Sequence, residues 1–207
     1  TKTCRRGGMG RLALGDANLK QINPGLIYAA ISGLVRSGPY GARAGFDLVA
    51  QGMSGLMSVT GERPDGPPVK VGPPVCDIVA GILLALGVVS AYTHRLKTGE
   101  GQMVDTSLFE AGVTLTYWQS AIAFATGIAP RALGSAHPLN APYQAVRTAD
   151  GYINLGAANA RSFARAIAAI GRPDLADDPR FADNAGRMAN TAALIAELES
   201  VFTTQPS

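Results

Sequence analysis

The sequence predicts an α/β protein, and three observations support that class. Apolar residues make up 47% of the 207 residues and charged residues only 16%, which leaves material for a sizeable core. A short apolar run over 26–32 is rich in β-forming residues and is bounded by Pro24-Gly25 and Gly33, as a buried strand would be. Long apolar segments at 77–97 and 107–126 have the length of helices.

The first half of the chain predicts one strand among helices and loops. Residues 15–21 form a short helical segment that ends before Asn23-Pro24. Apolar residues recur at helical spacing over 46–60, so a helix is expected there. The prolines and glycines of 61–74 then predict an extended surface loop.

The second half begins with the longest predicted helix, 77–97, which ends at a Lys-Thr-Gly turn. A brief strand is expected over 102–106, and Ser107 is expected to cap a helix that runs to 126. After a loop over 127–142, the turn at 149–151 separates two strands, 143–148 and 152–155. Two or three amphipathic helices fill 162–202.

These elements predict two domains, a partial large α/β domain over residues 1–140 and a small α+β portion over 141–207. The strand at 26–32 cannot form a doubly wound sheet alone, because a parallel sheet needs several strands covered on both faces. We therefore expect neighbouring strands from outside this sequence. The chain starts with Thr rather than Met, so a natural start is not assumed.

Composition excludes several classes of function. The net charge is only +3, and no basic run resembles a nucleic-acid tract. The two cysteines, Cys4 and Cys76, form no CxxC pair, so neither a disulfide framework nor a metal site is expected, and a reduced cytoplasmic compartment follows. No signal peptide is visible.

No membrane span is predicted either. The uncharged run 78–92 is shorter than the ~20 residues that cross a bilayer, and the run 111–130 carries five polar side chains.

Asp77 is the candidate catalytic residue. It follows a proline-rigid approach, 71–76, and opens the long helix. There the helix dipole, worth about 0.3–1 kcal/mol, and the backbone N–H groups of the first turn both favour the ionised form. A carboxylate so placed is a nucleophile at neutral pH, with amides nearby for an oxyanion. From local sequence alone, a plain N-cap Asp is the competing interpretation.

A wider pattern favours the catalytic interpretation. The ordered motifs resemble the class III coenzyme A transferases (CaiB/BaiF family) from about Leu14 to the C-terminus. They are Ile31-Ser32-Gly33, Ser37-Gly38-Pro39-Tyr40, Arg43-Ala44-Gly45-Phe46-Asp47, Ala50-Gln51, Ser54-Gly55, Thr60-Gly61, Gly72, Asp77, Ala80-Gly81, Ala85-Leu86, Arg95, Lys97-Thr98-Gly99, Gly101-Gln102, Val104-Asp105, Ser107-Leu108, His137, Pro142-Tyr143 and Asp150-Gly151-Tyr152.

The resemblance implies part of that family's fold, with a Rossmann-like large domain, and a covalent mechanism on Asp77. The carboxylate would take the acyl group of an acyl-CoA as a mixed anhydride and then become an aspartyl-CoA thioester, which an acceptor acid would reverse. Coenzyme A and acyl-CoA would be substrates, with no permanently bound cofactor. The family also implies an interlocked homodimer.

Other positions carry less weight. Arg43 lies where the family contacts CoA, and a cation there could meet a phosphate, although a solvated surface Arg is an equal alternative. His137 lies in a loop that can cover the active site and could touch a substrate carboxylate; the alternative is a surface histidine. Structural roles are expected for four other residues: His94 and Lys97 near the end of the long helix, Asp105, and Glu110.

Two rival hypotheses remain. The family includes α-methylacyl-CoA racemases, but their pattern has a His at the position of Phe46, which cannot exchange a proton. Because family members are much longer, the chain could instead be an inactive truncated product. Acyl donor and acceptor are not identified by the sequence; the branch with His137 indicates dicarboxylic acids such as succinate.

Overall fold

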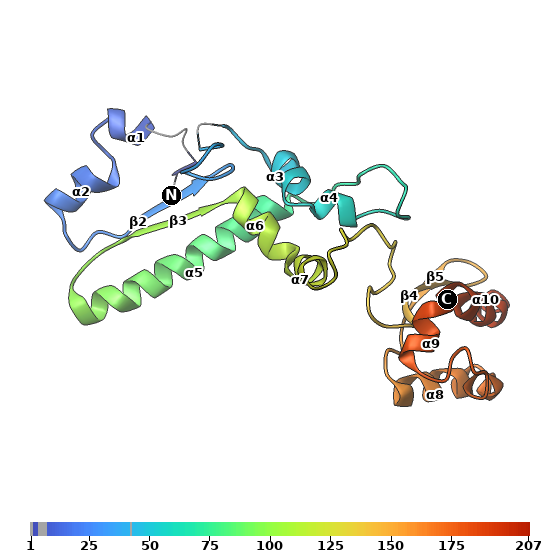
Figure 1. Cartoon of the computed structure of the whole chain (residues 1–207). Helices are drawn as coiled ribbons and strands as arrows, with labels where there is room; N and C mark the ends of the chain where they lie inside the picture. Colours follow the sequence, from blue (N-terminus) through green and yellow to red (C-terminus); the bar gives the residue numbers. More distant parts are fainter. Residues whose placement is uncertain (1, 4–7, 42) are drawn as a thin grey trace. The chain divides into compact units, whose positions relative to one another are not determined.

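The computed structural model describes residues 2–3, 8–41 and 43–207 (Figure 1). The chain divides into two compact units, Thr1–Ala132 and Leu133–Ser207. The boundary expected after residue 140 falls inside the second unit, because loop residues before it bond to a strand of that unit. The N–H of His137 donates to the Tyr143 carbonyl, and Ser135 Oγ accepts from the Ala145 N–H.

The first unit is built on a parallel sheet of three described strands in the order β1-β2-β3. The central strand, β2, starts two residues later than the sequence predicted. It pairs in parallel with β3, and the register extends from Tyr28↔Met103 to Ser32↔Ser107. Parallel neighbours need a long crossover, and here residues 33–102 supply it. The strands are β1 Lys2–Thr3, β2 Tyr28–Ser32 and β3 Met103–Ser107.

Two helices that the sequence predicted as continuous are broken. The predicted helix 46–60 is interrupted at Ser54-Gly55, where Gly55 takes a left-handed φ of 81°. The predicted helix 107–126 is interrupted at Thr116, which ends one helix and starts the next. The described helices of this unit are α1 Gly8–Arg11, α2 Asp16–Ile22, α3 Asp47–Met53, α4 Leu56–Val59, α5 Val75–Thr98, α6 Leu108–Leu115 and α7 Tyr117–Thr126.

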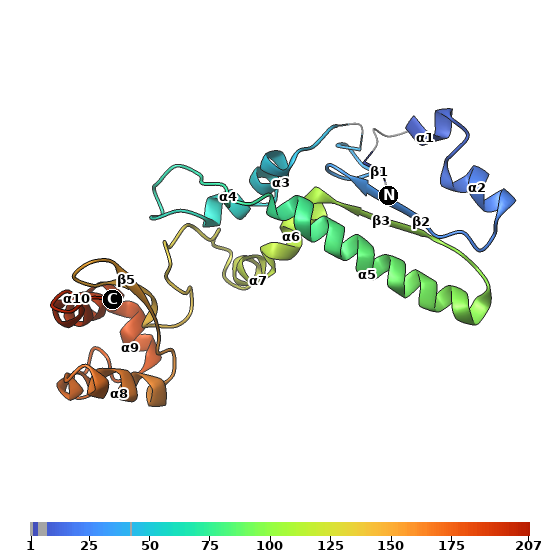
Figure 2. The same ribbon diagram turned by 180° about the vertical axis from the view of Figure 1, so that it is seen from behind.

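Helix α5 runs along the sheet beside β3, as both ribbon views show (Figures 1 and 2). Gly87 permits the close approach, because a Cβ there would lie 2.6 Å from Val104 Cγ1. The helix ends at Gly99, whose left-handed φ of 78° fits the predicted Lys-Thr-Gly stop.

Only one face of α5 is buried in this chain. Its buried residues are small or branched, whereas six large apolar side chains on the helix are exposed: Ile78, Ile82, Leu86, Val89, Tyr92 and Leu96. Within the described residues, Val75–Thr98 is the one helix whose length and hydropathy would allow it to cross a membrane, and the core helices of soluble enzymes pass the same test. The predicted run 111–130 is split by Thr116.

The second unit is a hairpin covered by short helices. As the sequence predicted, β4 and β5 pair antiparallel across the turn at 149–151. Six buried apolar residues form its core: Phe163, Ile167, Leu175, Phe181, Leu194 and Leu198. The elements are β4 Tyr143–Arg147, β5 Tyr152–Gly156, α8 Ala160–Ala169, the 3₁₀ turn η1 Pro173–Ala176, α9 Asn184–Ala189 and α10 Thr191–Phe202.

Candidate active site

Asp77 lies in the first turn of α5 and is exposed to solvent. The helix starts two residues earlier than predicted, so Pro74 rather than Asp77 is the N-cap residue, and its side chain makes no cap hydrogen bond. The interpretation of Asp77 as a plain N-cap is therefore wrong. Its carboxylate is open to a reactant instead of being folded back on the backbone.

The N-terminus of α5 is capped from another helix. Asp47, the first residue of α3, accepts a hydrogen bond from the Cys76 N–H on Oδ1 at 2.9 Å. Its Oδ2 accepts from the Gln51 side-chain amide at 2.6 Å. Gln51 is fully buried, and its Oε1 accepts from the Val71 N–H at 2.8 Å. The approach segment 71–76 is thus held at both ends by one pair of side chains.

These two residues carry a role that we did not predict from the sequence. Asp47 and Gln51 stand four residues apart, the spacing at which side chains on one helix face meet. That spacing is visible in the sequence. What it cannot reveal is that the pair faces the peptide groups of residues 71 and 76, since the contact depends on how α3 packs against α5.

A small-residue core supports this corner of the molecule. Ala50, Cys76, Ala80, Leu108 and Ala111 form one buried cluster from α3, α5 and α6.

The helices of this cluster approach closely because one residue of α6, Gly112, lacks a side chain. A Cβ on Gly112 would lie 2.8 Å from Ser54 Cβ and 3.2 Å from Cys76 Sγ. The backbone beneath Asp77 is therefore closely packed.

The cluster places Asp77 at the carboxyl ends of the parallel strands. Leu108 follows the end of β3 directly and packs in the same cluster as Cys76. At the end of β2, Gly33 meets Gly45 so closely that a Cβ on Gly33 would lie 2.6 Å from Gly45 Cα. In open α/β sheets ligands bind outside this edge.

The electrostatic environment of Asp77 differs from the expectation. Partial desolvation and the negative charge of Asp47 raise the pKa of Asp77, whereas the helix N-terminus was expected to favour its ionised form. Two local donors that could have favoured the ionised form are occupied. The Cys76 N–H is donated to Asp47 and the Val75 N–H to the Pro73 carbonyl, so these two amides are not available to the Asp77 carboxylate.

The neighbouring Cys76 is fully buried and is not a candidate nucleophile. Burial, and then the charges of Asp47 and Asp77, raise the pKa of the Cys76 thiol from 9.0 to about 11. The other cysteine, Cys4, lies outside the described residues.

Arg43 is exposed and its described contacts are local. Its N–H donates to the Tyr40 carbonyl at 2.9 Å, and its guanidinium carbon lies 4.7 Å from the centroid of the Tyr40 ring. The contact is of the cation–π kind. The structure does not bring Arg43 into contact with Asp77.

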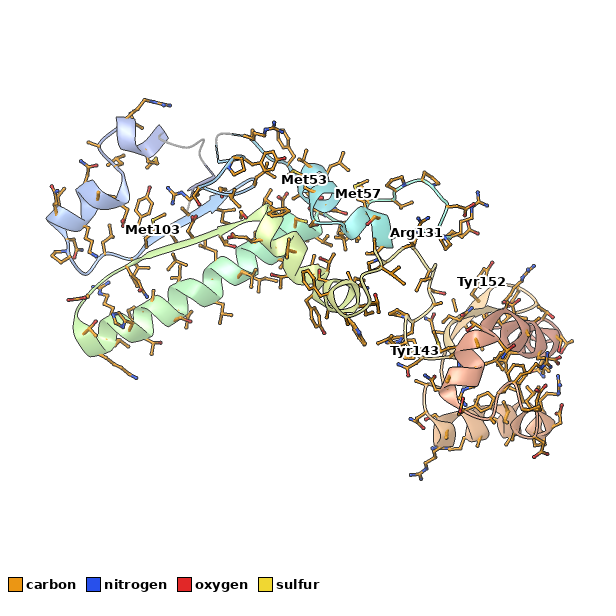
Figure 3. The ribbon with its side chains drawn as sticks, in the orientation of Figure 1. Met53, Met57, Met103, Arg131, Tyr143 and Tyr152 are labelled. Carbon is orange, nitrogen blue, oxygen red and sulfur yellow. The ribbon has the colours of Figure 1, made fainter. Side chains whose placement is uncertain are left out.

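His137 belongs to the second unit. Its Nδ1 accepts from the Leu139 N–H at 3.0 Å and also lies 3.3 Å from the Asn140 amide nitrogen. The ring packs edge to face on Tyr143, whose place on the hairpin is labelled in Figure 3, with centroids 5.1 Å apart. When His137 is neutral, a hydrogen bond accepted at Nδ1 leaves the proton on Nε2.

Asp105 and Glu110 make contacts that fit structural roles. Asp105 lies 3.6 Å from the Arg36 guanidinium. The Glu110 N–H donates to Ser107 Oγ, and the Ser107 hydroxyl donates to Glu110 Oε2. Ser107 therefore caps a helix as predicted. Among the described residues, no group of three or more His, Cys, Asp or Glu side chains could hold a metal ion.

The chain matches a protein family and several characterised relatives. The whole chain, residues 1–207, matches CoA-transferase family III. It is 38% identical over 201 residues to the succinate–glutarate CoA-transferase of Agrobacterium fabrum, covering 97% of this chain and 49% of that protein. It is 40% identical over 206 residues to the acetyl-CoA:oxalate CoA-transferase of Acetobacter aceti, covering 98% and 52%.

Solved structures give the same result. A CAIB/BAIF family protein from Brucella suis is 40% identical, with a TM-score of 0.80 over 97% of this chain and 53% of its own. The hypothetical protein Rv3272 from Mycobacterium tuberculosis is 32% identical, with a TM-score of 0.87 over 99% and 54%. The chain spans about half the length of the relatives it matches. Because the match extends over the entire sequence, this chain belongs to CoA-transferase family III.

Proposed function

We propose that this chain supplies the nucleophilic carboxylate, Asp77, of an enzyme that moves CoA from an acyl-CoA to a carboxylic acid. The observation that carries the proposal is an exposed carboxylate in the first turn of α5, on a backbone fixed by Asp47 and Gln51. Membership of the family adds the reaction class.

The first half of the reaction forms two covalent intermediates. An Asp77 oxygen attacks the thioester carbonyl carbon, the C–S bond breaks, and CoA leaves as thiolate with the bonding electron pair. The thiolate then attacks the Asp77 carbonyl of the mixed anhydride. The donor acid leaves as carboxylate with one oxygen from Asp77, and an aspartyl-CoA thioester remains.

The second half reverses these steps with the acceptor. The acceptor carboxylate attacks the thioester, CoA thiolate leaves again, and a second anhydride forms. Thiolate attack on the acceptor carbonyl gives acceptor-CoA and returns Asp77 with one oxygen from the acceptor. No proton is transferred in the sequence, so a carboxylate without a partner base suffices.

Arg43 of the first unit and His137 of the second unit are each assigned a substrate-binding role within this proposal. We assign Arg43 to a phosphate of CoA, because its exposed guanidinium is a multiple donor. We assign His137 to the acceptor carboxylate. Substitution of Arg43 by Ala should raise KM for every acyl-CoA, and substitution of His137 by Ala should raise KM for the acid alone.

The substrates and the assembly are also part of the proposal. Dicarboxylic acids are the expected acceptors, since relatives are named for glutarate and oxalate. CoA binds as a substrate, and the working enzyme is a cytoplasmic homodimer. The racemase alternative would need a proton-transferring group where α3 begins, and Phe46 occupies that position with 76% of its surface exposed.

An isotope experiment tests the covalent route. The complete reading frame that contains residues 1–207 is expressed and turned over with succinyl-CoA and glutarate labelled with ¹⁸O in both carboxylates. Mass spectrometry should find ¹⁸O in the peptide that holds Asp77. The Asp77→Ala enzyme should lose turnover by at least about a thousandfold, as loss of a nucleophile does. Full activity of that variant, or turnover that leaves Asp77 unlabelled, would refute the proposal.

A further inference from the structure

The contacts of Asp47 and Gln51 form a continuous clamp around the approach to Asp77. Each oxygen of the Asp47 carboxylate has a different partner, the Cys76 N–H and the Gln51 amide. The Gln51 amide in turn uses its oxygen on the Val71 N–H. We call these two side chains the Asp47–Gln51 clamp.

The other described hydrogen bonds of the segment inside the clamp are local: Lys70 Nζ donates to the Val71 and Gly72 carbonyls, and the Val75 N–H donates to the Pro73 carbonyl. Pro73 and Pro74 have no N–H, so they cannot be tied down by backbone donation. Gly72 is exposed. The N-cap residue is a proline, which has no side-chain acceptor for the first turn of α5. The clamp therefore replaces the missing cap, and it does so one residue before the proposed nucleophile.

We propose that Asp47 and Gln51 are positioning residues of the transfer reaction, which act through the backbone to hold Asp77 in line with the thioester carbon. This inference rests on the proposed function of Asp77. Neither residue needs to touch the substrate. Covalent attack requires reacting atoms about 3–3.5 Å apart, and a displacement of about 1 Å can lower the rate about a hundredfold.

The alternative is a clamp that only stabilises the fold. A structural role would lower folded yield or thermal stability and leave kcat per folded molecule unchanged. A positioning role lowers kcat in a folded enzyme and leaves KM for acyl-CoA unchanged, because binding surfaces elsewhere are intact.

The chain allows a hydrogen-bond swap that separates these roles. In Asp47→Asn, the amide oxygen can still accept from Cys76, but its NH₂ then faces the NH₂ of Gln51. In Asp47→Asn/Gln51→Glu, the new Asn NH₂ donates to the new Glu, whose second oxygen accepts from Val71. The double variant restores all three hydrogen bonds and moves the negative charge from residue 47 to residue 51.

Kinetics of the full-length enzyme decide the inference. We expect Asp47→Asn to lower kcat about 10- to 100-fold with KM for succinyl-CoA within about twofold, and the double variant to regain kcat to within about fivefold of the original. Asp178→Asn is the matched control, since Asp178 also accepts from a backbone N–H and a side chain, those of Arg180. It should leave kcat unchanged.

Each other outcome overturns part of the argument. Two results would refute the positioning role. One is a folded Asp47→Asn enzyme with normal kcat, and the other is a folded double variant whose kcat is as low as that of the single variant. If Asp47→Asn does not fold, the double variant alone decides by its kcat. If Asp77→Ala remains active, the proposed function fails first, and that result is independent of the clamp variants.

Discussion

The thiol of Cys76 gives a quantitative probe of the packing beneath Asp77. Its side chain is fully buried between α3, α5 and α6, and its pKa is raised to about 11 by burial and by the charges of Asp47 and Asp77. A thiol of pKa 9.0 is about 9% thiolate at pH 8, whereas a thiol of pKa about 11 is about 0.1% thiolate. Ionisation alone should therefore slow alkylation of Cys76 about 90-fold relative to the unfolded chain.

The assay is alkylation by iodoacetamide at pH 8, followed by mass spectrometry of the Cys76 peptide in native and denatured protein. In the native protein the rate should keep rising about tenfold per pH unit towards pH 11, because the thiolate fraction does. Equal rates in the two states would refute the burial. A native rate that levels off near pH 9 would show that reaction passes through an opened form with an ordinary thiol.

The raised pKa of Cys76 also makes the stability of the fold depend on pH. The folded state holds the Cys76 proton to a higher pH than the unfolded state, so the stabilisation is full below the unfolded pKa and is lost as pH rises through the folded one. A difference of about two pKa units corresponds to at most about 3 kcal/mol, lost between about pH 9 and pH 11. A Cys76→Ala variant supplies the baseline, and a gap between the two proteins that does not change over that window would contradict the shift.

Three further changes have defined outcomes. Asp77→Asn should raise the free energy of unfolding at pH 7, because the raised pKa of Asp77 means that its ionisation opposes folding. This gain should disappear below about pH 4, where the carboxyl group is protonated in both states. Urea titrations at both pH values measure the difference, and no gain at pH 7 would contradict the prediction. Gly33→Ala should force the backbone away from Gly45, so the folded enzyme should have a lower kcat, with a smaller proportional effect on its thermal stability. A variant with the original kcat would show that the close approach is dispensable. Arg187→Met should destabilise the second unit by about 2–5 kcal/mol, because the carbonyls of Ala141 and Phe181 lose their donor and the Phe163 ring loses its cation–π contact. Hydrogen exchange over residues 140–202 measures this loss, and unchanged protection would refute the prediction.

Several elements could be read from the sequence because their signals are local. Gly99 stops α5 with a left-handed turn, Ser107 caps α6, and the turn at 149–151 joins two strands, since each depends on a few neighbouring residues. The breaks at Gly55 and Thr116 were not predicted. Apolar spacing continues across both positions, and only packing of α4 and α7 separates the segments.

The site shows the same division between local and distant information. The position of Asp77 near the mouth of a long helix follows from the prolines before it and the apolar run after it. The direction of its pKa shift does not. That shift comes first from partial desolvation and then from Asp47, thirty residues earlier, which accepts from the Cys76 N–H and brings a negative charge to the helix end.

What the sequence alone determined about this protein is its class, its family resemblance and the candidate nucleophile, because these rest on composition and on the order of short motifs. The tertiary structure alone decided which side chains hold the segment that precedes Asp77. Asp47 and Gln51 meet residues 71 and 76 only when α3 packs against the start of α5, and hydrogen bonds between segments so far apart leave no periodic mark in the chain.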